Sequence, residues 1–274
     1  MLRNTKELEG YAIGASDGVI GHVKDFYFDD DEWVIRYLVV ETGRWLASRQ
    51  VLISPIAIDN PDWGNRLLPV SISKEQVRSS PDIDTDKPVS RQHEADHHTY
   101  YGYPYYWEVA CPGGEDMPAN PLPRGRGAID PAPASGSEGA HPHLSNEGHP
   151  AGDPHLRSGA AISGYRLHAV DGDIGHVAGL LVDDRTWAIL YLVVATGHWW
   201  SGQTVLIAPA WIDEVSWLES AVSVRVTREA VKAAPAYDPD TPLDRQHEMN
   251  LYRHYGRRGY WAGAEFVHSR IVQI

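Results

Sequence analysis

The sequence predicts a mainly β protein in which one small unit is used twice. Three observations lead to this prediction: an internal repeat, short β-branched strands separated by turn signals, and a Pro- and Gly-rich segment between the two copies. The hydrophobic share of 42% is ordinary for a globular chain, so the sequence has enough apolar residues to form a core.

The internal repeat dominates the chain. The pair Gly10-Tyr11 recurs at 164–165, and the offset of 154 then holds without a gap to Trp107 and Trp261. Of the 98 positions from 10 to 107, 42 are identical to their partners. An ungapped match of this length predicts one fold used twice. Two copies are too few for a solenoid, so each copy has its own core or the pair shares one.

We therefore divide the chain into four segments: a first repeat at 1–107, a linker at 108–158, a second repeat at 159–261 and a C-terminal tail at 262–274. The linker holds nine prolines and eight glycines. Such a segment buries too little apolar surface to offset the entropy lost on ordering it, so we expect a flexible connection.

The first copy begins with a hairpin. The apolar segments 11–13 and 19–23 flank Asp17-Gly18, and Asp-Gly between apolar runs signals a hairpin because Gly adopts a positive φ without steric cost. The second strand is expected to run on to an acidic turn at 29–32. This turn lacks the alternating ligands and central Gly of a calcium loop, so we predict that it is solvated.

A long central strand is predicted at 33–40, where β-branched and aromatic residues dominate. Arg36 is its one polar residue and aligns with Leu190, so we expect solvent on that face in the first copy. Residues 45–46 and 50–53 then predict a short hairpin.

Pro55 ends this hairpin, and a further strand is predicted at 67–72. Residues 73–78 predict one or two helical turns, with Ser73 as the N-cap in the first copy and Thr227 in the second. Five or six short strands with turns between them indicate a small closed antiparallel barrel.

Composition excludes several classes of function. The net charge is −13, and we find no cluster of Lys and Arg, so we expect neither nucleic-acid binding nor docking on an anionic membrane. Cys111 is the single cysteine, which excludes an intrachain disulfide and suggests a reducing compartment. No apolar stretch is long enough to form a membrane span or a signal peptide. We expect a soluble, cytoplasmic protein with no integral membrane segment.

Several motifs, repeated in order in both copies, resemble the PRC-barrel family, which is named for the barrel of the photosynthetic reaction centre H subunit and includes the ribosome-maturation factor RimM. In the first copy they are Gly-x-Ile-Gly at 18–21, the acidic turn, Tyr-Leu-Val-Val at 37–40, Val-Leu-Ile-Ser-Pro at 51–55 and Ser-Arg-Gln-His-Glu at 90–94 with its aromatic tail. The resemblance covers 5–107 and 159–261. It implies two small antiparallel PRC-type β-barrels with short helical turns, joined by a disordered linker.

The resemblance also carries an expectation about function. The H subunit has a membrane helix before its barrel and RimM has a ribosome-protein-binding domain, and we expect neither here. The resemblance therefore implies a non-enzymatic tandem protein that acts in interaction or assembly with an unidentified protein partner. We expect the repeats to pack on each other or to homo-oligomerise. An alternative is a peripheral factor of a photosynthetic or other energy-transducing membrane complex.

The segment from His93 to His97 matches His-Glu-x-x-His, a zinc-protease signature that places two imidazoles on one helix face. The second copy has Leu251 in place of the second histidine. We therefore expect no metal, no cofactor and no catalytic residue, and keep a metal-dependent hydrolase using His93, Glu94 and His97 as an alternative. The favoured interpretation is that the tail residues bond back to the barrel. These residues are Arg91, His93, Glu94, Arg245, His247 and Glu248.

An aromatic tail follows this motif at 100–107. Tyr103 and Tyr105 have no aromatic counterpart in the second copy, so we expect them to form an exposed contact patch, because Tyr is favoured at protein interfaces. Trp107 of the first copy is matched by Trp261 of the second. We expect both to pack or to contribute to the same interaction surface.

Overall fold

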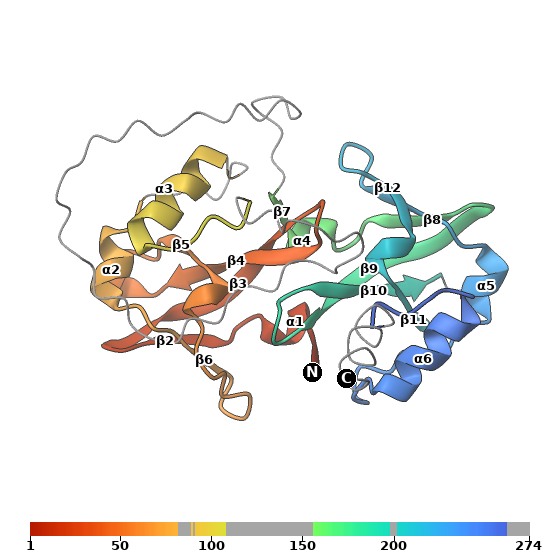
Figure 1. Cartoon of the computed structure of the whole chain (residues 1–274), viewed down its shortest axis with the longest axis horizontal. Coiled ribbons are helices and arrows are strands. Elements are labelled where there is room, and N and C mark those ends of the chain that lie inside the picture. Colours follow the sequence, from red (N-terminus) through yellow and green to blue (C-terminus); the bar gives the residue numbers. More distant parts are fainter. Residues whose placement is uncertain (82–88, 90, 108–155, 198–201, 262–274) are drawn as a thin grey trace, which may run out of the picture.

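The computed structural model describes residues 1–81, 89, 91–107, 156–197 and 202–261, without the side chains of 91 and 92 (Figure 1). The tail at 262–274 and the predicted linker up to residue 155 lie outside the described residues. The first repeat contains β1 (Leu2–Asn4), α1 (Thr5–Leu8), β2 (Ala12–Ala15), β3 (Gly18–Asp29), β4 (Val34–Thr42), β5 (Gln50–Ile53), β6 (Leu67–Pro69), α2 (Lys74–Ser79) and α3 (Arg91–Tyr101). The second contains β7 (Leu156–Ser158), α4 (Gly159–Ile162), β8 (Arg166–Ala169), β9 (Gly172–Asp183), β10 (Ile189–Thr196), β11 (Thr204–Ile207), β12 (Ile212–Ser216), β13 (Ala221–Val224), α5 (Arg228–Lys232) and α6 (Arg245–His254).

The strands form two sheets, which confirms the mainly β class. One sheet has the order β5-β4-β3-β2-β6, with β7 also on β3, and the other has the order β11-β10-β9-β8-β13-β12, with β1 also on β9. The prediction of closed antiparallel barrels was wrong in two respects. Neither order returns to its first strand among the described residues, and the pairs β2–β6 and β8–β13 are parallel.

Two glycines explain the Gly-x-Ile-Gly motif that opens β3. Gly18 has a φ of +127°, which the turn after Asp17 requires and which L side chains rarely adopt. At Gly21 a Cβ atom would lie 2.1 Å from the carbonyl oxygen of Glu41 on β4. At Gly175, the equivalent glycine of the second repeat, a Cβ atom would lie 2.1 Å from the carbonyl oxygen of Ala195 on β10. The motif therefore serves strand pairing.

The short helices after the sheets follow the sequence prediction. Ser73 caps α2, and with Gln76 it forms a capping box in which each side chain bonds the other residue's backbone N–H. Thr227 caps α5 by accepting a hydrogen bond from the N–H of Ala230. Both predicted N-caps are confirmed.

Other predictions about the first repeat need correction. The strand predicted at 67–72 ends at Pro69, and residues 45–46 lie in a 3₁₀ turn (Arg44–Leu46) instead of a hairpin strand. The polar tails form helices α3 and α6 of 11 and 10 residues, so helical structure is not limited to short turns. Both helices are polar, so the sequence there lacks the periodic apolar residues from which a helix is predicted.

Arg36 was expected to face solvent but is only 2% exposed. Its guanidinium carbon lies 3.8 Å from the centre of the Tyr106 ring, and its Nη2 donates to Glu32. The segment that follows α3 covers this face of β4, and it encloses an arginine where the second repeat has a leucine.

The two repeats exchange their first strands. Strand β1 of the first repeat pairs with β9 of the second, and β7 of the second pairs with β3 of the first. Strand β7 begins at Leu156, so the predicted linker boundary at 158 was three residues too far along the chain. Along one edge, β3 therefore pairs first with β2 of its own repeat and then with β7 of the other. In the same way, β9 pairs first with β8 and then with β1.

A second contact lies beside the exchanged strands. The N–H of Ile35 donates to the carbonyl of Trp187 at 2.9 Å, and the N–H of Ile189 donates to the carbonyl of Trp33 at 2.7 Å. These bonds are equivalent under the offset of 154, so the repeats are related by a pseudo-twofold axis. Both tryptophans have a positive φ, of 56° and 61°, a conformation that costs a bulky residue energy.

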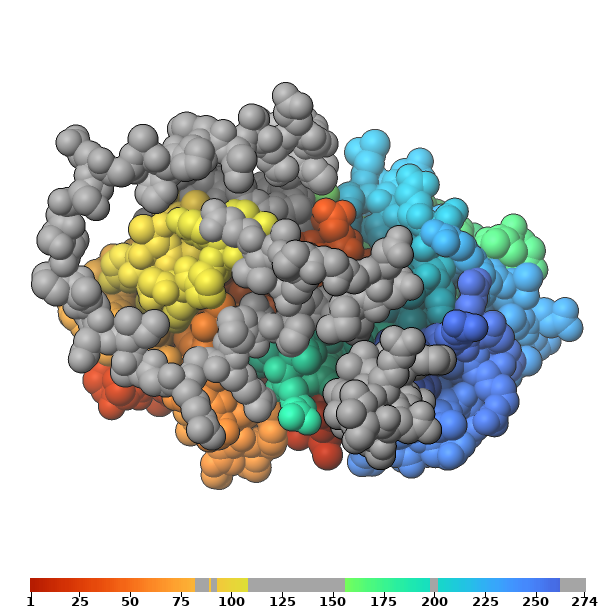
Figure 2. Space-filling model, viewed as in Figure 1, coloured from red at the N-terminus to blue at the C-terminus, as the bar shows by residue number. Residues whose placement is uncertain are grey.

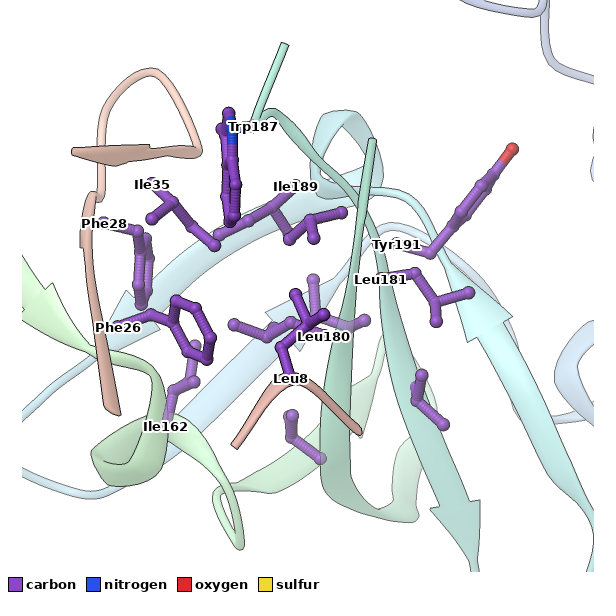
Figure 3. Close-up of a cluster of buried hydrophobic side chains, with 14 of the residues drawn as sticks. Leu8, Phe26, Phe28, Ile35, Ile162, Leu180, Leu181, Trp187, Ile189 and Tyr191 are labelled. Atoms are coloured by element: carbon purple, nitrogen blue, oxygen red, sulfur yellow. The ribbon is translucent and has the colours of Figure 1, made fainter. Parts of the chain in front are cut away.

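The two repeats share one hydrophobic core, which decides between the two possibilities that the sequence left open. Figure 3 shows side chains of both repeats meeting at the junction, and in Figure 2 coloured atoms of the two repeats touch where the junction is in view. Leu8 of α1 and its counterpart Ile162 of α4 are both fully buried there. The labelled residues of the first repeat are Leu8, Phe26, Phe28 and Ile35, and those of the second include Ile162, Leu180, Leu181, Trp187 and Ile189.

The shared core predicts that both repeats unfold together. Phe28 is fully buried, and its ring centre lies 5.3 Å from that of Trp33 and 6.4 Å from that of Trp217 in the other repeat. We expect Phe28→Ala to lower the free energy of unfolding by about 3–5 kcal/mol, because it leaves a cavity. Denaturant unfolding followed by tryptophan fluorescence and circular dichroism should show one transition, shifted as a whole.

The control is Val19→Ala, at a position that is about half exposed, which we expect to change stability by less than about 0.5 kcal/mol. Two separate transitions, of which only one moves in the Phe28 variant, would contradict the shared core.

Candidate functional site

Each exchanged strand carries an arginine that joins the two repeats. Arg157 of β7 donates from Nε to Oδ2 of Asp30 at 2.7 Å, and its guanidinium lies 4.5 Å from the Trp217 ring. Arg3 of β1 lies 3.8 Å from Asp184 and 4.3 Å from the Trp63 ring. In each case the arginine and the tryptophan belong to one repeat and the aspartate to the other.

These contacts correct the prediction of a fully solvated acidic turn. Asp29 is 5% exposed, and its Oδ1 accepts the N–H groups of Asp31 and Glu32. Burial raises the pKa of Asp30 against the opposing effect of Arg157. The first two acidic residues of the turn are therefore structural, while Asp31 and Glu32 lie exposed.

A buried carboxylate anchors α3 to the first sheet. Oε1 of Glu94 accepts the hydroxyl of Tyr106 at 2.5 Å. Nearby, the hydroxyl of Tyr37 lies 3.0 Å from Nε2 of His98, whose Nδ1 is 2.9 Å from the carbonyl oxygen of Pro104. Because that carbonyl only accepts, Nδ1 carries the proton and Nε2 accepts from Tyr37. Burial, and then the charge of Glu94, raise the pKa of Tyr37 well above its usual value, so Tyr37 remains a donor.

The same arrangement recurs under α6. Oε1 of Glu248 accepts the hydroxyls of Tyr191 and Tyr260, both at 2.8 Å, and Oε2 lies 2.9 Å from Nη1 of Arg245. Burial is the main cause of the raised pKa of both tyrosines. We call these groups the Glu94 cluster (Tyr37, Glu94, Tyr106) and the Glu248 cluster (Tyr191, Glu248, Tyr260). Their members are equivalent under the offset of 154.

Comparison with known families agrees with this architecture. The PRC-barrel domain family matches residues 5–77, which run from α1 into α2. Residues 5–77 belong to the PRC-barrel family. The match does not extend to the second repeat, whose relation to this PRC-barrel unit rests on sequence identity and on the equivalent order of strands. No curated protein matches the chain. Within the described ranges, no helix has the length and apolar character needed to cross a membrane.

The tail residues of the two repeats divide into two sets. Glu94, Glu248 and Arg245 contact the tyrosines described above, whereas His93 and His247 lie on the surface. The side chain of Arg91 lies outside the described residues. The glutamate is therefore the member of the shared His-Glu pair that holds each tail helix on its sheet.

The two histidines of the His-Glu-x-x-His motif in the first repeat lie in different environments. His97 is buried with its Nε2 3.1 Å from the carbonyl oxygen of Leu52 on β5, while His93 is exposed. Burial lowers the pKa of His97 to about 4, with a smaller contribution from His98. The only three-residue group suited to a metal within the described part of the chain is Asp29, Asp30 and Asp31, where the first two bond within the fold.

The aromatic residues predicted as an interaction surface are half-buried. Tyr103 stacks on Tyr101 at 5.4 Å, and Tyr105 stacks on Trp107 at 4.9 Å while its hydroxyl lies 2.8 Å from Thr99. Trp261 lies under the guanidinium of Arg245 at 4.4 Å. Tyr103 and Tyr105, which were expected to form an exposed contact patch, pack beside α3 and expose only part of their rings.

Two features escaped the sequence analysis although the sequence carries a signal for each. Leu2-Arg3 matches Leu156-Arg157 under the same offset, which indicates an equivalent first strand in each repeat but not the sheet that it joins. No basic cluster was predicted either, but Arg253, Arg257 and Arg258 lie exposed around the end of α6.

The Glu94 cluster predicts a large effect from one substitution. Glu94→Ala leaves the Tyr106 hydroxyl without its acceptor, and a polar group that loses its partner in this way costs about 1–3 kcal/mol. We expect the variant to lose stability by that amount and α3 to become accessible to protease. Glu94→Gln keeps an acceptor and should lose less. Limited proteolysis and denaturant unfolding measure both effects, and equal losses in the two variants would contradict the role of the acceptor.

His97 predicts a pH dependence. The unfolded chain binds a proton at His97 with the ordinary pKa of 6.5, whereas the folded chain does so only near 4. The contribution of His97 to the free energy of unfolding is therefore complete above pH 6.5. It decreases by about 1.4 kcal/mol per pH unit as the pH falls from there towards 4. We expect His97→Leu, which copies Leu251, to remove this loss. Denaturant titrations from pH 7 to 4.5 measure it, and a constant difference between the two proteins would contradict the prediction.

Proposed function

We propose that the chain is a non-enzymatic interaction module, in which a PRC-barrel unit and its repeat form one rigid scaffold for a protein partner. One observation carries this proposal. The side chains best suited to catalysis in the sequence are engaged in internal contacts, Glu94 with Tyr106 and His97 with the carbonyl of Leu52.

The shape of the scaffold supports an assembly role. The strand exchange and the shared core tie the two repeats together, and α3 and α6 lie at opposite ends of the molecule (Figure 1). Beside α3, the stacked pair Tyr105 and Trp107 exposes part of its rings. Rigid, partly exposed aromatic side chains are the residues that most often dominate binding energy at interfaces. The resemblance to PRC-barrel proteins also implies an assembly role, and it therefore supports the same proposal.

The pair Tyr105 and Trp107 provides the test of the interaction. We expect the double variant Tyr105→Ala, Trp107→Ala to lose at least about tenfold in partner recovery, because each aromatic anchor contributes about 2 kcal/mol at a binding hot spot. Quantitative affinity purification from native lysate, with the intact chain as bait, measures this recovery. Circular dichroism establishes that the double variant remains folded.

The matched control is His93→Ala, an exposed residue outside the aromatic stack, which should recover partners as the unchanged chain does. Equal recovery with the double variant would contradict the proposed surface. Hydrolase activity that depends on His93 or Glu94, together with stoichiometric metal in the purified protein, would contradict the non-enzymatic role. The narrower hypothesis of a factor for a photosynthetic or other energy-transducing complex rests on the family resemblance, and co-purification with such a complex would test it.

A further inference from the structure

A cavity of about 200 Å³ lies in the second repeat, between β11 and α6. Its apolar wall includes Leu206, Leu243 and Leu251, and its polar lining includes Tyr237, Asp238, Thr241 and His247. Neither the strand exchange nor the Glu248 cluster uses these polar groups.

The imidazole of His247 has a defined orientation. Its Nδ1 lies 2.7 Å from Oδ1 of Asp244, which also accepts the backbone N–H of His247 at 2.8 Å. These two hydrogen bonds hold the pKa of Asp244 below its ordinary value, so the carboxylate is ionised and accepts. In the neutral ring Nδ1 therefore carries the proton, and Nε2 is the hydrogen-bond acceptor.

The negative charge around the cavity limits the kinds of ligand that it can bind. Oδ1 of Asp238 accepts the N–H of Asp240, and its Oδ2 accepts the hydroxyl of Thr241 at 2.9 Å. With Asp244 nearby, two carboxylates lie at this end of α6. An anionic ligand would be repelled, whereas a neutral ligand with a hydrogen-bond donor matches Nε2 of His247.

The first repeat shows that this combination is not a requirement of the fold. His97 occupies the position of Leu251, and its Nε2 approaches the carbonyl of Leu52, the counterpart of Leu206. The wall that is apolar in the second repeat therefore contains an imidazole in the first, although both repeats keep a surface histidine at the equivalent position (93 and 247).

We propose that the cavity binds a small neutral phenol as a free molecule, with its ring against the leucines and its hydroxyl donating to Nε2 of His247. The size agrees, because an enclosed apolar cavity of about 150 Å³ admits benzene, and this pocket is larger and partly open to solvent. Such a site goes beyond the proposed interaction module, which needs no small ligand.

The experiment compares three probes on the full chain: p-cresol, toluene, and 4-methylbenzoate. We expect chemical-shift titration by NMR to show p-cresol bound about tenfold more tightly than toluene, from one added hydrogen bond to His247, and no binding of the anion. His247→Leu should reduce p-cresol to the affinity of toluene and leave toluene unchanged. His93→Leu, the equivalent substitution in the first repeat, should change neither affinity.

A second variant tests the wall. Leu251→His introduces the residue found at the equivalent position of the first repeat, His97. It should weaken the binding of both p-cresol and toluene, since it places a polar group among the leucines. Equal affinity of p-cresol and toluene, an unchanged p-cresol affinity in His247→Leu, or an equal loss in His93→Leu would overturn the proposal. Tighter binding of N-acetyltyrosinamide than of p-cresol would also overturn it, in favour of a tyrosine side chain from a partner.

Discussion

The reciprocal exchange of first strands is the constraint on which the rest of the structure depends. Because β1 pairs with β9 and β7 pairs with β3, neither sheet is complete without three residues from the other repeat. The exchange brings Leu8 and Ile162 into one core and places Arg3 and Arg157 next to the aspartates of the opposite repeat. Hydrophobic burial, backbone hydrogen bonds and ion pairs thus meet at the same junction.

Much of the local structure followed from the sequence. The hairpin at Asp17-Gly18 and the caps at Ser73 and Thr227 depend on residues within a few positions of each other, so short-range rules predict them. The strand exchange depends on contacts between residues more than a hundred positions apart. Neither turn chemistry nor hydrophobic period records which repeat a strand will join, and this is why closed barrels were predicted in place of two open sheets.

The candidate site was harder to predict than the fold. The sequence showed that His-Glu is kept in both copies, but only the structure shows that Glu94 and Glu248 bond tyrosines while the histidines face outward. Arg36 was misjudged because the aromatic segment that covers it lies some 70 positions further along the chain. A buried charge of this kind costs free energy unless it is paired. Glu32 supplies the pairing from the preceding turn, and the Tyr106 ring covers the guanidinium once the segment after α3 is in place.

The exchanged strands also impose an order on biosynthesis. As the chain leaves the ribosome, residues 1–107 emerge without β7, so the outer half of one edge of β3 has no partner until Ser158 has been made. Strand β1 waits longer still, because β9 ends at Asp183. The nascent first repeat therefore presents an open sheet edge and part of an uncovered core during synthesis, the kind of intermediate that is prone to aggregation and that chaperones protect.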